Sequence, residues 1–372
     1  MDTTTEGLYD DEYDFSFNVT DDPASSENFK ENQLLSMSHI YIPMMYFIIF
    51  FAGFSGNLFV LIVIGNRHKK NRRLVDTFVL NLALADLVFV LTLPMWAVSA
   101  GQHDHWPFGI GMCKISSYII TVNRFSNIFF LTCMSVDRYL AVVRLMDSNF
   151  LRSSRCVHIT CVVVWVASLL LGTPSLVYRV VIIKSDDSGS CTDNLESLFF
   201  RAMILLTVCL TFMLPMLIIT LCYGSILMKL RSHSVTAGNS RAEARRRHSL
   251  KIVFTIITAF LVSWLPYNVL KSIQVISKMS NAELDQDTHI YLARGLVISS
   301  CLAFVNSCAN PAIYLFLDKH FRRSAAALCM NCLSYGEAQN SYISSNSISN
   351  STMENLGSTA SRGRLFSLTQ KN

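Results

Sequence analysis

Arg138 lies between an acid and an aromatic residue, Asp137 and Tyr139, at the cytoplasmic edge of the third of seven long apolar segments. A guanidinium at a membrane boundary can be held by a neighbouring carboxylate in one state and offered to a cytosolic partner in another. An ion pair at the end of any surface helix would look the same, and it would contribute about 0–1 kcal/mol without a function. The triplet therefore needs support from polar residues in the other segments.

Such residues are present deep within the apolar segments. Asp86 lies in the second segment, and amide side chains occur in the third and the seventh. Hydrocarbon offers them no partner, so they are expected to meet one another or an ion. A packing residue with satisfied hydrogen bonds explains any one of them alone, but together they predict a small site for sodium and for no other metal. Its residues are Asp86, Asn123, Asn127, Trp264, Asn306, Ser307 and Asn310.

A second polar site is predicted at the outer end of the bundle. Arg124 lies about one turn below Ile120, at a depth where a guanidinium is costly unless an anion, an amide or water meets it. One interpretation is that Asn123, Asn127 or backbone carbonyls satisfy it; the other is that a ligand's carboxylate does, through a charge-assisted contact. The predicted ligand pocket consists of Trp96, Ile120, Arg124, Arg179, Arg201, Lys271 and Arg294.

The composition agrees with a chain that crosses the membrane many times. Of the 372 residues, 51% are hydrophobic and 15% are charged, and each apolar run can cross about 30 Å of hydrocarbon, which takes roughly 20 helical residues. This predicts an all-α membrane protein, a seven-transmembrane helix bundle with a short amphipathic eighth helix. The expected spans are Ile40 to Gly65, Val75 to Ala100, Ile110 to Val143, Cys156 to Val177, Leu198 to Leu230, Leu250 to Ser277 and Ile290 to Leu317.

The charges of the connections set the expected orientation. Basic residues gather after the first span, at 67–73, and between the fifth and sixth, at 241–247, which predicts that both connections are cytosolic. Residues 1–39 are then a disordered acidic extracellular arm, 40–317 the bundle, 318–333 the juxtamembrane helix and 334–372 a disordered Ser/Thr-rich cytosolic tail. We expect a multi-pass protein of the plasma membrane. The first span itself would direct insertion, since no secretory signal precedes it.

Several modifications follow from this topology. Asn18 begins an Asn-Val-Thr glycosylation motif in the acidic arm, where Tyr9 and Tyr13 are candidates for sulfation and a merely solubilising arm is the alternative. Cys113 and Cys191 are the only two cysteines expected to face the oxidising exterior, which predicts one disulfide between them. Cys329 and Cys332 follow the seventh span and are candidates for palmitoylation or free thiols.

The motifs, each in its own span and in order, resemble those of the rhodopsin-like (class A) G-protein-coupled receptors. They are Gly56-Asn57, Leu82 to Asp86, Asp137-Arg138-Tyr139, Trp165, Pro215, Ser263 to Pro266 and Asn310 to Tyr314. Within this family, three further motifs resemble those of the chemoattractant peptide receptors, a group that includes the chemokine receptors. The motifs are Thr92-Leu93-Pro94, residues 106–109 (Trp106 to Gly109) and the run DRYLAVV that begins at Asp137. The chain departs from chemokine receptors in lacking cysteines for a second extracellular disulfide, and it has Ser300 where many of them have Glu.

The resemblance implies a function for these residues. An extracellular peptide or chemokine-like ligand would move the sixth span about a hinge formed by Phe260, Trp264 and Pro266. This opens a crevice for a heterotrimeric G protein, of the inhibitory class by the family pattern, at Asp137, Arg138, Tyr139, Tyr223, Asn310, Pro311 and Tyr314. Receptor kinases and arrestin would act on the tail serines between Ser344 and Thr352.

Other classes of protein fit less well. A transporter would show internal repeats, and the odd number of spans argues against them. A scavenger receptor that binds the same ligand without signalling usually has a degraded Asp-Arg-Tyr triplet, and this one is intact. The sequence shows no nucleophile with a base and no phosphate loop, so we expect neither an enzyme nor a nucleic-acid-binding protein, and no cofactor other than sodium.

Overall fold

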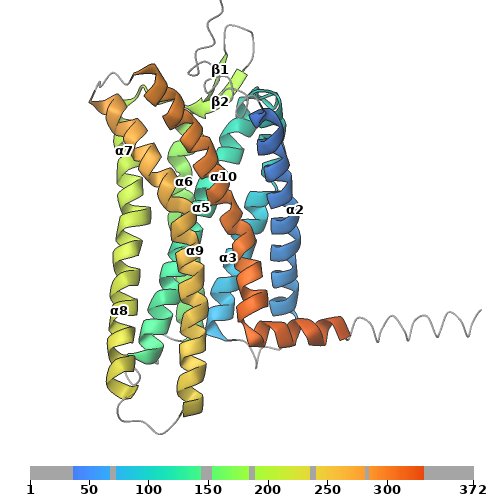
Figure 1. Ribbon diagram of the computed structural model, residues 1–372, viewed down its shortest axis with the longest axis vertical. Helices are drawn as coiled ribbons and strands as arrows, with labels where there is room; N and C mark the ends of the chain where they lie inside the picture. The colour runs from blue at the N-terminus through green and yellow to red at the C-terminus, as the bar shows by residue number, and fades with distance from the viewer. Residues whose placement is uncertain are drawn as a thin grey trace, which may run out of the picture.

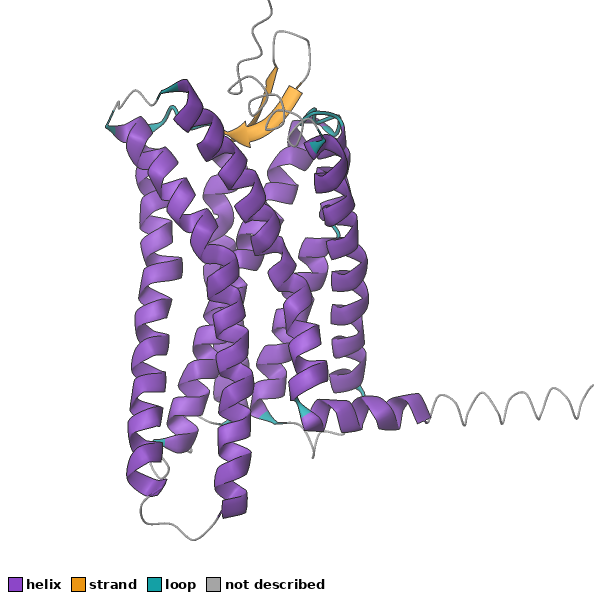
Figure 2. Ribbon diagram, in the orientation of Figure 1, coloured by secondary structure: helices purple, strands orange, loops and turns teal. Residues whose placement is uncertain are grey.

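The chain folds into a bundle of seven long helices, as the sequence predicted (Figures 1 and 2). The computed structural model describes residues 37–67, 73–143, 153–183, 189–234, 240–280 and 285–330. The helices are α2 (Ser38–Gly65), α3 (Leu74–Val90), α4 (Leu93–Gly101), α5 (Gly109–Val142), α6 (Ser154–Tyr178), α7 (Leu198–Val208), α8 (Leu214–Ser234), α9 (Ser240–Met279) and α10 (Gln286–Leu317), with a π-helical segment, η2 (Cys209–Met213), between α7 and α8.

Two of the spans consist of more than one element. α3 and α4 together make Leu74–Gly101, and α7, η2 and most of α8 make Leu198–Lys229. All seven observed spans begin and end within three residues of the predicted ones. The break before α4 lies beside Pro94, and η2 ends just before Pro215, because proline has no N–H for the preceding turn.

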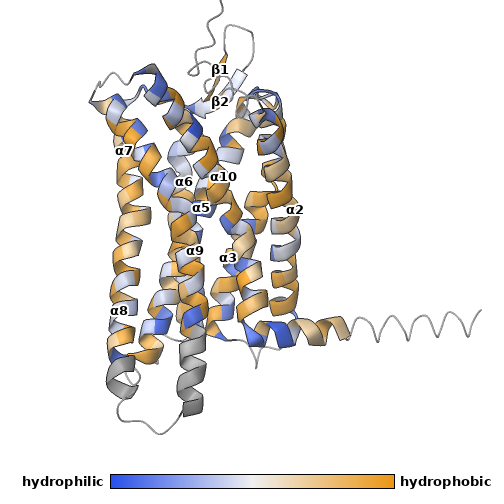
Figure 3. Cartoon of the chain, viewed as in Figure 1, coloured by the Kyte–Doolittle hydropathy of each residue, from blue (hydrophilic) through white to orange (hydrophobic). Residues whose placement is uncertain are grey.

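The outer faces of the helices are apolar, as Figure 3 shows. Ile48, Phe51 and Leu170 each leave more than 60% of their surface exposed, on helices whose mean hydropathy suits a membrane. Lipid offers no hydrogen bonds, so the backbone must satisfy its own groups, and a helix does so within one segment. The exposed apolar residues therefore face lipid.

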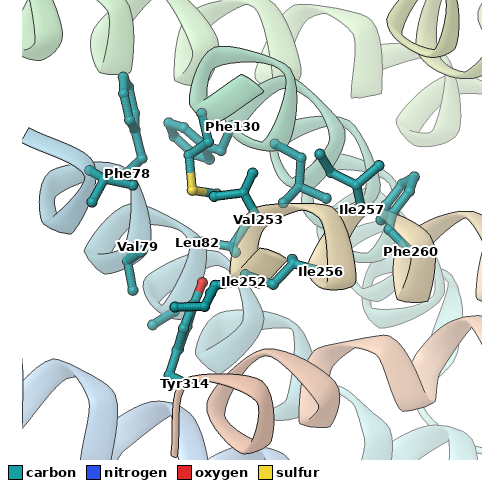
Figure 4. Close-up of a cluster of buried hydrophobic side chains, with 14 of the residues drawn as sticks. Phe78, Val79, Leu82, Phe130, Ile252, Val253, Ile256, Ile257, Phe260 and Tyr314 are labelled. Atoms are coloured by element: carbon teal, nitrogen blue, oxygen red, sulfur yellow. The ribbon is translucent and has the colours of Figure 1, made fainter. Parts of the chain in front are cut away.

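The largest apolar core lies in the half of the bundle away from the strands. Figure 4 shows Phe78 and Leu82 of α3, Phe130 of α5 and Val253 and Ile256 of α9 converging there. These side chains come from helices far apart in sequence, so a displacement of α9 must repack this core. The core is consequently one of the places where two states of the bundle would differ.

A two-stranded sheet covers the other end of the bundle, here called the hairpin end. β1 (Arg179–Ile183) pairs antiparallel with β2 (Gly189–Asp193), and Val181 is opposite Cys191. The predicted disulfide between Cys113 and Cys191 is confirmed; its Cα atoms are 5.8 Å apart. The bond fixes β2 to the start of α5, and Figure 1 shows the sheet above the bundle.

The predicted eighth helix is present at 319–330 and runs across the opposite end of the bundle (Figure 1). Phe321, Ala325 and Leu328 pack on the core, and the other side of the helix is exposed, which makes it amphipathic. Asp318 accepts hydrogen bonds from the amides of His320, at 2.8 Å, and Phe321, and so caps the first turn.

Ion pairs hold this helix to the start of α3. Arg73 reaches Asp318 at 2.7 Å and Asp76 at 2.9 Å, and Arg67 reaches Asp76 at 2.6 Å. Burial raises the pKa of Asp318, but Arg73 outweighs that effect and holds it below its usual value. The sequence reasoning counted these arginines only as loop charges. Cys329 is exposed on the helix.

Some predictions concern residues outside the described ranges. These are the acidic arm with Tyr9, Tyr13 and Asn18, the second tail cysteine, Cys332, and the serines of the tail.

Candidate functional site

Asp86 is fully buried near the middle of the bundle and is surrounded by hydrogen-bond donors. Its Oδ1 accepts from the Nδ2 of Asn123 at 2.9 Å, the Nδ2 of Asn127 at 2.8 Å and the Oγ of Ser307 at 3.0 Å. Its Oδ2 accepts from the Nδ2 of Asn310 at 3.0 Å. The carboxylate thus joins α3, α5 and α10 through four donors, and all four had been predicted from the sequence.

Two other members of the predicted cluster do not bond to Asp86. The Oδ1 of Asn306 and the Nε1 of Trp264 are both buried and have no hydrogen-bond partner among the described residues. The Oδ1 of Asn127 is also buried and has no hydrogen-bond partner among the described residues. The cluster therefore combines a carboxylate that accepts four hydrogen bonds with the side-chain oxygens of Asn127 and Asn306, which accept none among the described residues.

The cluster extends to α2 through Asn57. Its Nδ2 donates to the carbonyl of Ser307 at 2.9 Å and to that of Gly53 at 2.8 Å. Gly56, next to it, lies against the ring of Pro311, and a Cβ there would come within 3.0 Å of that ring. The Gly56-Asn57 and Asn310-Pro311 motifs thus pack on each other, and a side chain at position 56 would require the ring of Pro311 to shift by a few tenths of an ångström.

A cavity of about 230 Å³ opens at the hairpin end. Five of the predicted pocket residues line it: Trp96, Ile120, Arg124, Arg179 and Lys271. Tyr46, Tyr267, Asn268 and Phe304 also line it and were not predicted. The other two predicted residues lie elsewhere: Arg201 donates to the carbonyl of Lys278, and Arg294 is not part of the lining.

Asp193 is the acid of this cavity, and sequence reasoning missed it. Its Oδ1 is 2.8 Å from the Nη1 of Arg179 and its Oδ2 is 3.0 Å from the Nζ of Lys271. Burial raises the pKa of Asp193, but Arg179 and Lys271 outweigh that effect and hold the pKa well below its usual range. The spacing from Cys191 could have indicated it. Side chains two residues apart on a strand share a face, so Asp193 points to the same side as the disulfide-bonded Cys191.

Arg124 differs from the other two cations of the cavity. Among the described residues it makes no hydrogen bond or ion pair, and its Nε is sealed from solvent without a partner. Its guanidinium carbon lies over three rings, 4.9 Å from the centroid of Phe125, 5.7 Å from Trp264 and 5.9 Å from Tyr267. The amide and carbonyl partners considered from the sequence are thus not used. With three cations and one acid, the cavity carries a net charge of +2.

The triplet lies at the opposite end of the bundle. The Nη2 of Arg138 is 3.3 Å from the Oδ2 of Asp137. Nearby, the hydroxyls of Tyr223 and Tyr314 are buried and have no hydrogen-bond partner among the described residues. Arg138 and Tyr314 share a small cavity of about 30 Å³ with Ile252 and Ile256 of α9. Of the predicted switch residues, Arg138 and Tyr314 thus share this cavity, whereas Asn310 bonds to Asp86 nearer the middle of the bundle. The hydroxyls of Tyr223 and Tyr314 are left unsatisfied among the described residues.

The bundle, the buried carboxylate cluster and the paired Asp-Arg define a class of protein. The family described as 7 transmembrane receptor (rhodopsin family) matches residues 56–314, and the chain belongs to it. It is a multi-pass membrane protein and a G-protein-coupled receptor, not an enzyme.

Particular relatives narrow the class. The chain is 42% identical to the mouse protein named Probable G-protein coupled receptor 25 over 298 residues, which cover 79% of the chain and 80% of that relative. It is 37% identical to zebrafish Apelin receptor A, over 83% of the chain and 86% of that relative, and 35% identical to Xenopus laevis Apelin receptor A, over 86% and 88%.

Replacing Asp193 with asparagine tests the ion pairs of the cavity. Arg179 and Lys271 would keep their charges without a carboxylate, so we expect the free energy of unfolding to fall by about 1–3 kcal/mol. Because the pKa of Asp193 is lowered, the ionised form is the one that stabilises, and its contribution is present above the unfolded value of about 3.9 and lost only in strong acid. Thermal unfolding of purified receptor measures the loss of stability, which should be the same at pH 5.5 and at pH 7.4.

The matched control is Glu196→Gln. Glu196 pairs with Lys278 at 2.9 Å but is 82% exposed, so its loss should leave the unfolding temperature unchanged. Equal losses in the two variants, or a wild-type unfolding temperature that falls steeply between pH 7.4 and 5.5 and does not do so in Asp193→Asn, would contradict the analysis.

Proposed function

We propose that the chain is a plasma-membrane receptor for an extracellular peptide or chemokine-like protein whose carboxylate-bearing end enters the cavity at the hairpin end. The observation that carries this proposal is the net charge of +2 in a cavity where Arg124 has no anionic partner. A carboxylate is the group that two of the guanidinium N–H donors bind side by side. The aromatic lining would contact the apolar part of the same ligand.

The arrangement of the cations supports a deep position for the carboxylate. Arg179 and Lys271 already share Asp193, so an arriving anion gains least there and most at Arg124. The N-terminal arm, which the sequence predicts to be acidic and outside, would attract a basic ligand body and speed its capture. The relatives named apelin receptors are consistent with an extracellular ligand.

The signal would leave at the opposite end through Arg138. Pro266 lies inside α9 and interrupts its hydrogen-bond ladder, so the helix can bend there. Outward movement of α9 would open the space beside Arg138, and the hydroxyls of Tyr223 and Tyr314 would gain partners that they lack in this state. A G protein, of the inhibitory class by the family pattern, would bind in that space.

Desensitisation belongs to the same proposal. Phosphates added by receptor kinases to the tail serines would each bring a charge of about −1.5 to −2, and arrestin would bind them. The alternative function is a scavenger receptor that binds the same ligand without signalling. Nucleotide exchange on a G protein distinguishes the two.

We include a sodium ion at Asp86 in the proposal. The carboxylate supplies a full charge, and the unpaired amide oxygens of Asn127 and Asn306 are the kind of ligand that hard cations prefer. An ion there would hold α3, α5 and α10 together, so agonists, which favour the open state, would bind less tightly in sodium.

Arg138→Ala tests the receptor assignment. The variant should bind agonist and reach the cell surface as the wild type does, while nucleotide exchange falls to the level of cells without receptor. Exchange on purified G protein measures this, and Arg155→Ala, which removes an exposed arginine at the same end, is the control. Full exchange by Arg138→Ala would remove the assignment; a wild type that binds agonist but stimulates no G protein would favour the scavenger.

Asp86→Asn tests the sodium site. The substitution removes the only full charge of the cluster, so agonist affinity should no longer depend on sodium. Agonist binding is measured in sodium chloride and in choline chloride at equal ionic strength, which separates ion binding from screening. Sodium that lowers affinity in both wild type and variant would show that the ion binds elsewhere.

The carboxylate is tested with the first activating peptide from a screen of secreted peptides. The acid and the C-terminal amide are compared, and for an acidic side chain the comparison is Glu against Gln. Losing a charge-assisted hydrogen bond of about 1.5–3 kcal/mol should lower wild-type potency roughly 10- to 150-fold. Arg124→Gln should lose potency for the acid and discriminate little between the two forms. Equal potency of both forms on the wild type would exclude a carboxylate contact.

A further inference from the structure

Arg124 touches the part of α9 that has to move. Its guanidinium lies over the rings of Trp264 and Tyr267, at 5.7 Å and 5.9 Å. Trp264 lies two residues before Pro266, and Tyr267 follows it directly. The two rings meet edge to face at 5.9 Å, and Trp264 is also 6.0 Å from the ring of Phe260. A residue of α5 thus contacts α9 at its proline.

The contact is electrostatic, and among the described residues no hydrogen bond or ion pair of Arg124 competes with it. A cation is attracted to the face of an aromatic ring. Asp193, the acid of the cavity, has one oxygen on Arg179 and the other on Lys271. Asp193 therefore attracts Arg124 only from a distance, and the aromatic faces are the groups in direct contact with its guanidinium among the described residues.

A carboxylate in the cavity would change this balance. Two charge-assisted hydrogen bonds to a guanidinium are stronger than its attraction to neutral rings. The side chain would turn toward the anion, because Arg124 lines the cavity and its Nε has no hydrogen-bond partner among the described residues. The charge that held Trp264 and Tyr267 against α5 would then be neutralised.

We infer that Arg124 couples ligand to receptor movement: its contact with Trp264 and Tyr267 restrains α9 in the resting state, and a ligand carboxylate releases the restraint. The inference rests on the proposed function and deepens it, because it makes the anion a trigger as well as an anchor. An anchor alone lowers potency when it is lost. A restraint that is lost also raises activity without any ligand.

The first measurement is basal nucleotide exchange by purified full-length receptor in nanodiscs. Arg124→Met keeps an apolar stem of similar length and removes the charge, and it should raise basal exchange about two- to fivefold, the factor that corresponds to one lost contact of about 0.5–1 kcal/mol. Arg124→Lys keeps a cation at this position and should raise basal exchange less than Arg124→Met does. Lys114→Met removes a cation of the same helix that does not line the cavity, and it should leave the rate unchanged.

The second measurement follows α9 directly, without a G protein. Spin labels are attached at Lys251→Cys on α9 and Arg155→Cys at the start of α6, in a chain whose exposed cysteines are replaced by serine. The distance between the labels should lengthen in Arg124→Met. Benzoate, a carboxylate small enough for the cavity, should lengthen it in the wild type, and its neutral match benzamide should not.

The outcomes separate this inference from the proposed function. Movement of α9 in Arg124→Met without exchange on any G protein would sustain the inference and remove the signalling function. Exchange that depends on Arg138, together with an Arg124→Met receptor whose basal rate and label distance equal the wild type, would overturn the inference alone. An equal rise in Arg124→Met and Arg124→Lys, or no effect of benzoate on the distance, would also overturn it, because the restraint would not depend on charge or on an anion.

Discussion

The rest of the structure depends on the fact that hydrocarbon cannot hydrogen-bond to a polar group. A carboxylate at the depth of Asp86 must therefore find its partners within the bundle, and it finds four, from α5 and α10. Those bonds fix how three helices lie against one another. Asn57 extends the same requirement to α2, and the apolar side chains are left to face lipid or to fill the core.

The charged residues at the two ends of the bundle differ in how far they are paired. At the opposite end, each of four charges forms an ion pair with another of them, although the Nε of Arg67 has no partner among the described residues, and these pairs hold helix 319–330 in place. The four residues are Arg67, Arg73, Asp76 and Asp318. At the hairpin end, Asp193 satisfies two cations and leaves a third without an anion. Pairing of every charge suits a part that stays fixed, and incomplete pairing suits a place that receives a ligand.

The unsatisfied groups also show where a second state could gain interactions. The hydroxyls of Tyr223 and Tyr314 and the Nε of Arg124 lie on helices that border α9 or face it, and the indole N–H of Trp264 lies on α9 itself. Buried polar atoms without partners cost free energy, so a rearrangement that pairs them is favoured to that extent. α9, which contains Pro266 and packs through the large apolar core, is the element whose displacement could do so.

The sequence by itself determined the seven spans, the disulfide and the carboxylate cluster. Long apolar runs allow only helices in a membrane, two exterior cysteines have only each other, and Asp86 has to meet amides at a similar depth. A short amphipathic helix was also predicted at 318–333, and the described helix 319–330 lies within that range.

Only the tertiary structure decided which charges meet. Arg124, Arg179, Lys271, Arg201 and Arg294 look alike in the sequence, and the fold alone places three of them in one cavity and two outside it. Asp193 enters that cavity because a disulfide and a strand register turn it inward. Pairing of charges depends on distances of a few ångströms between segments that are far apart in the sequence, and approximate span boundaries do not give those distances. A membrane span, in contrast, requires only a sufficient length of apolar residues and partners for its polar groups, and both can be recognised in the sequence.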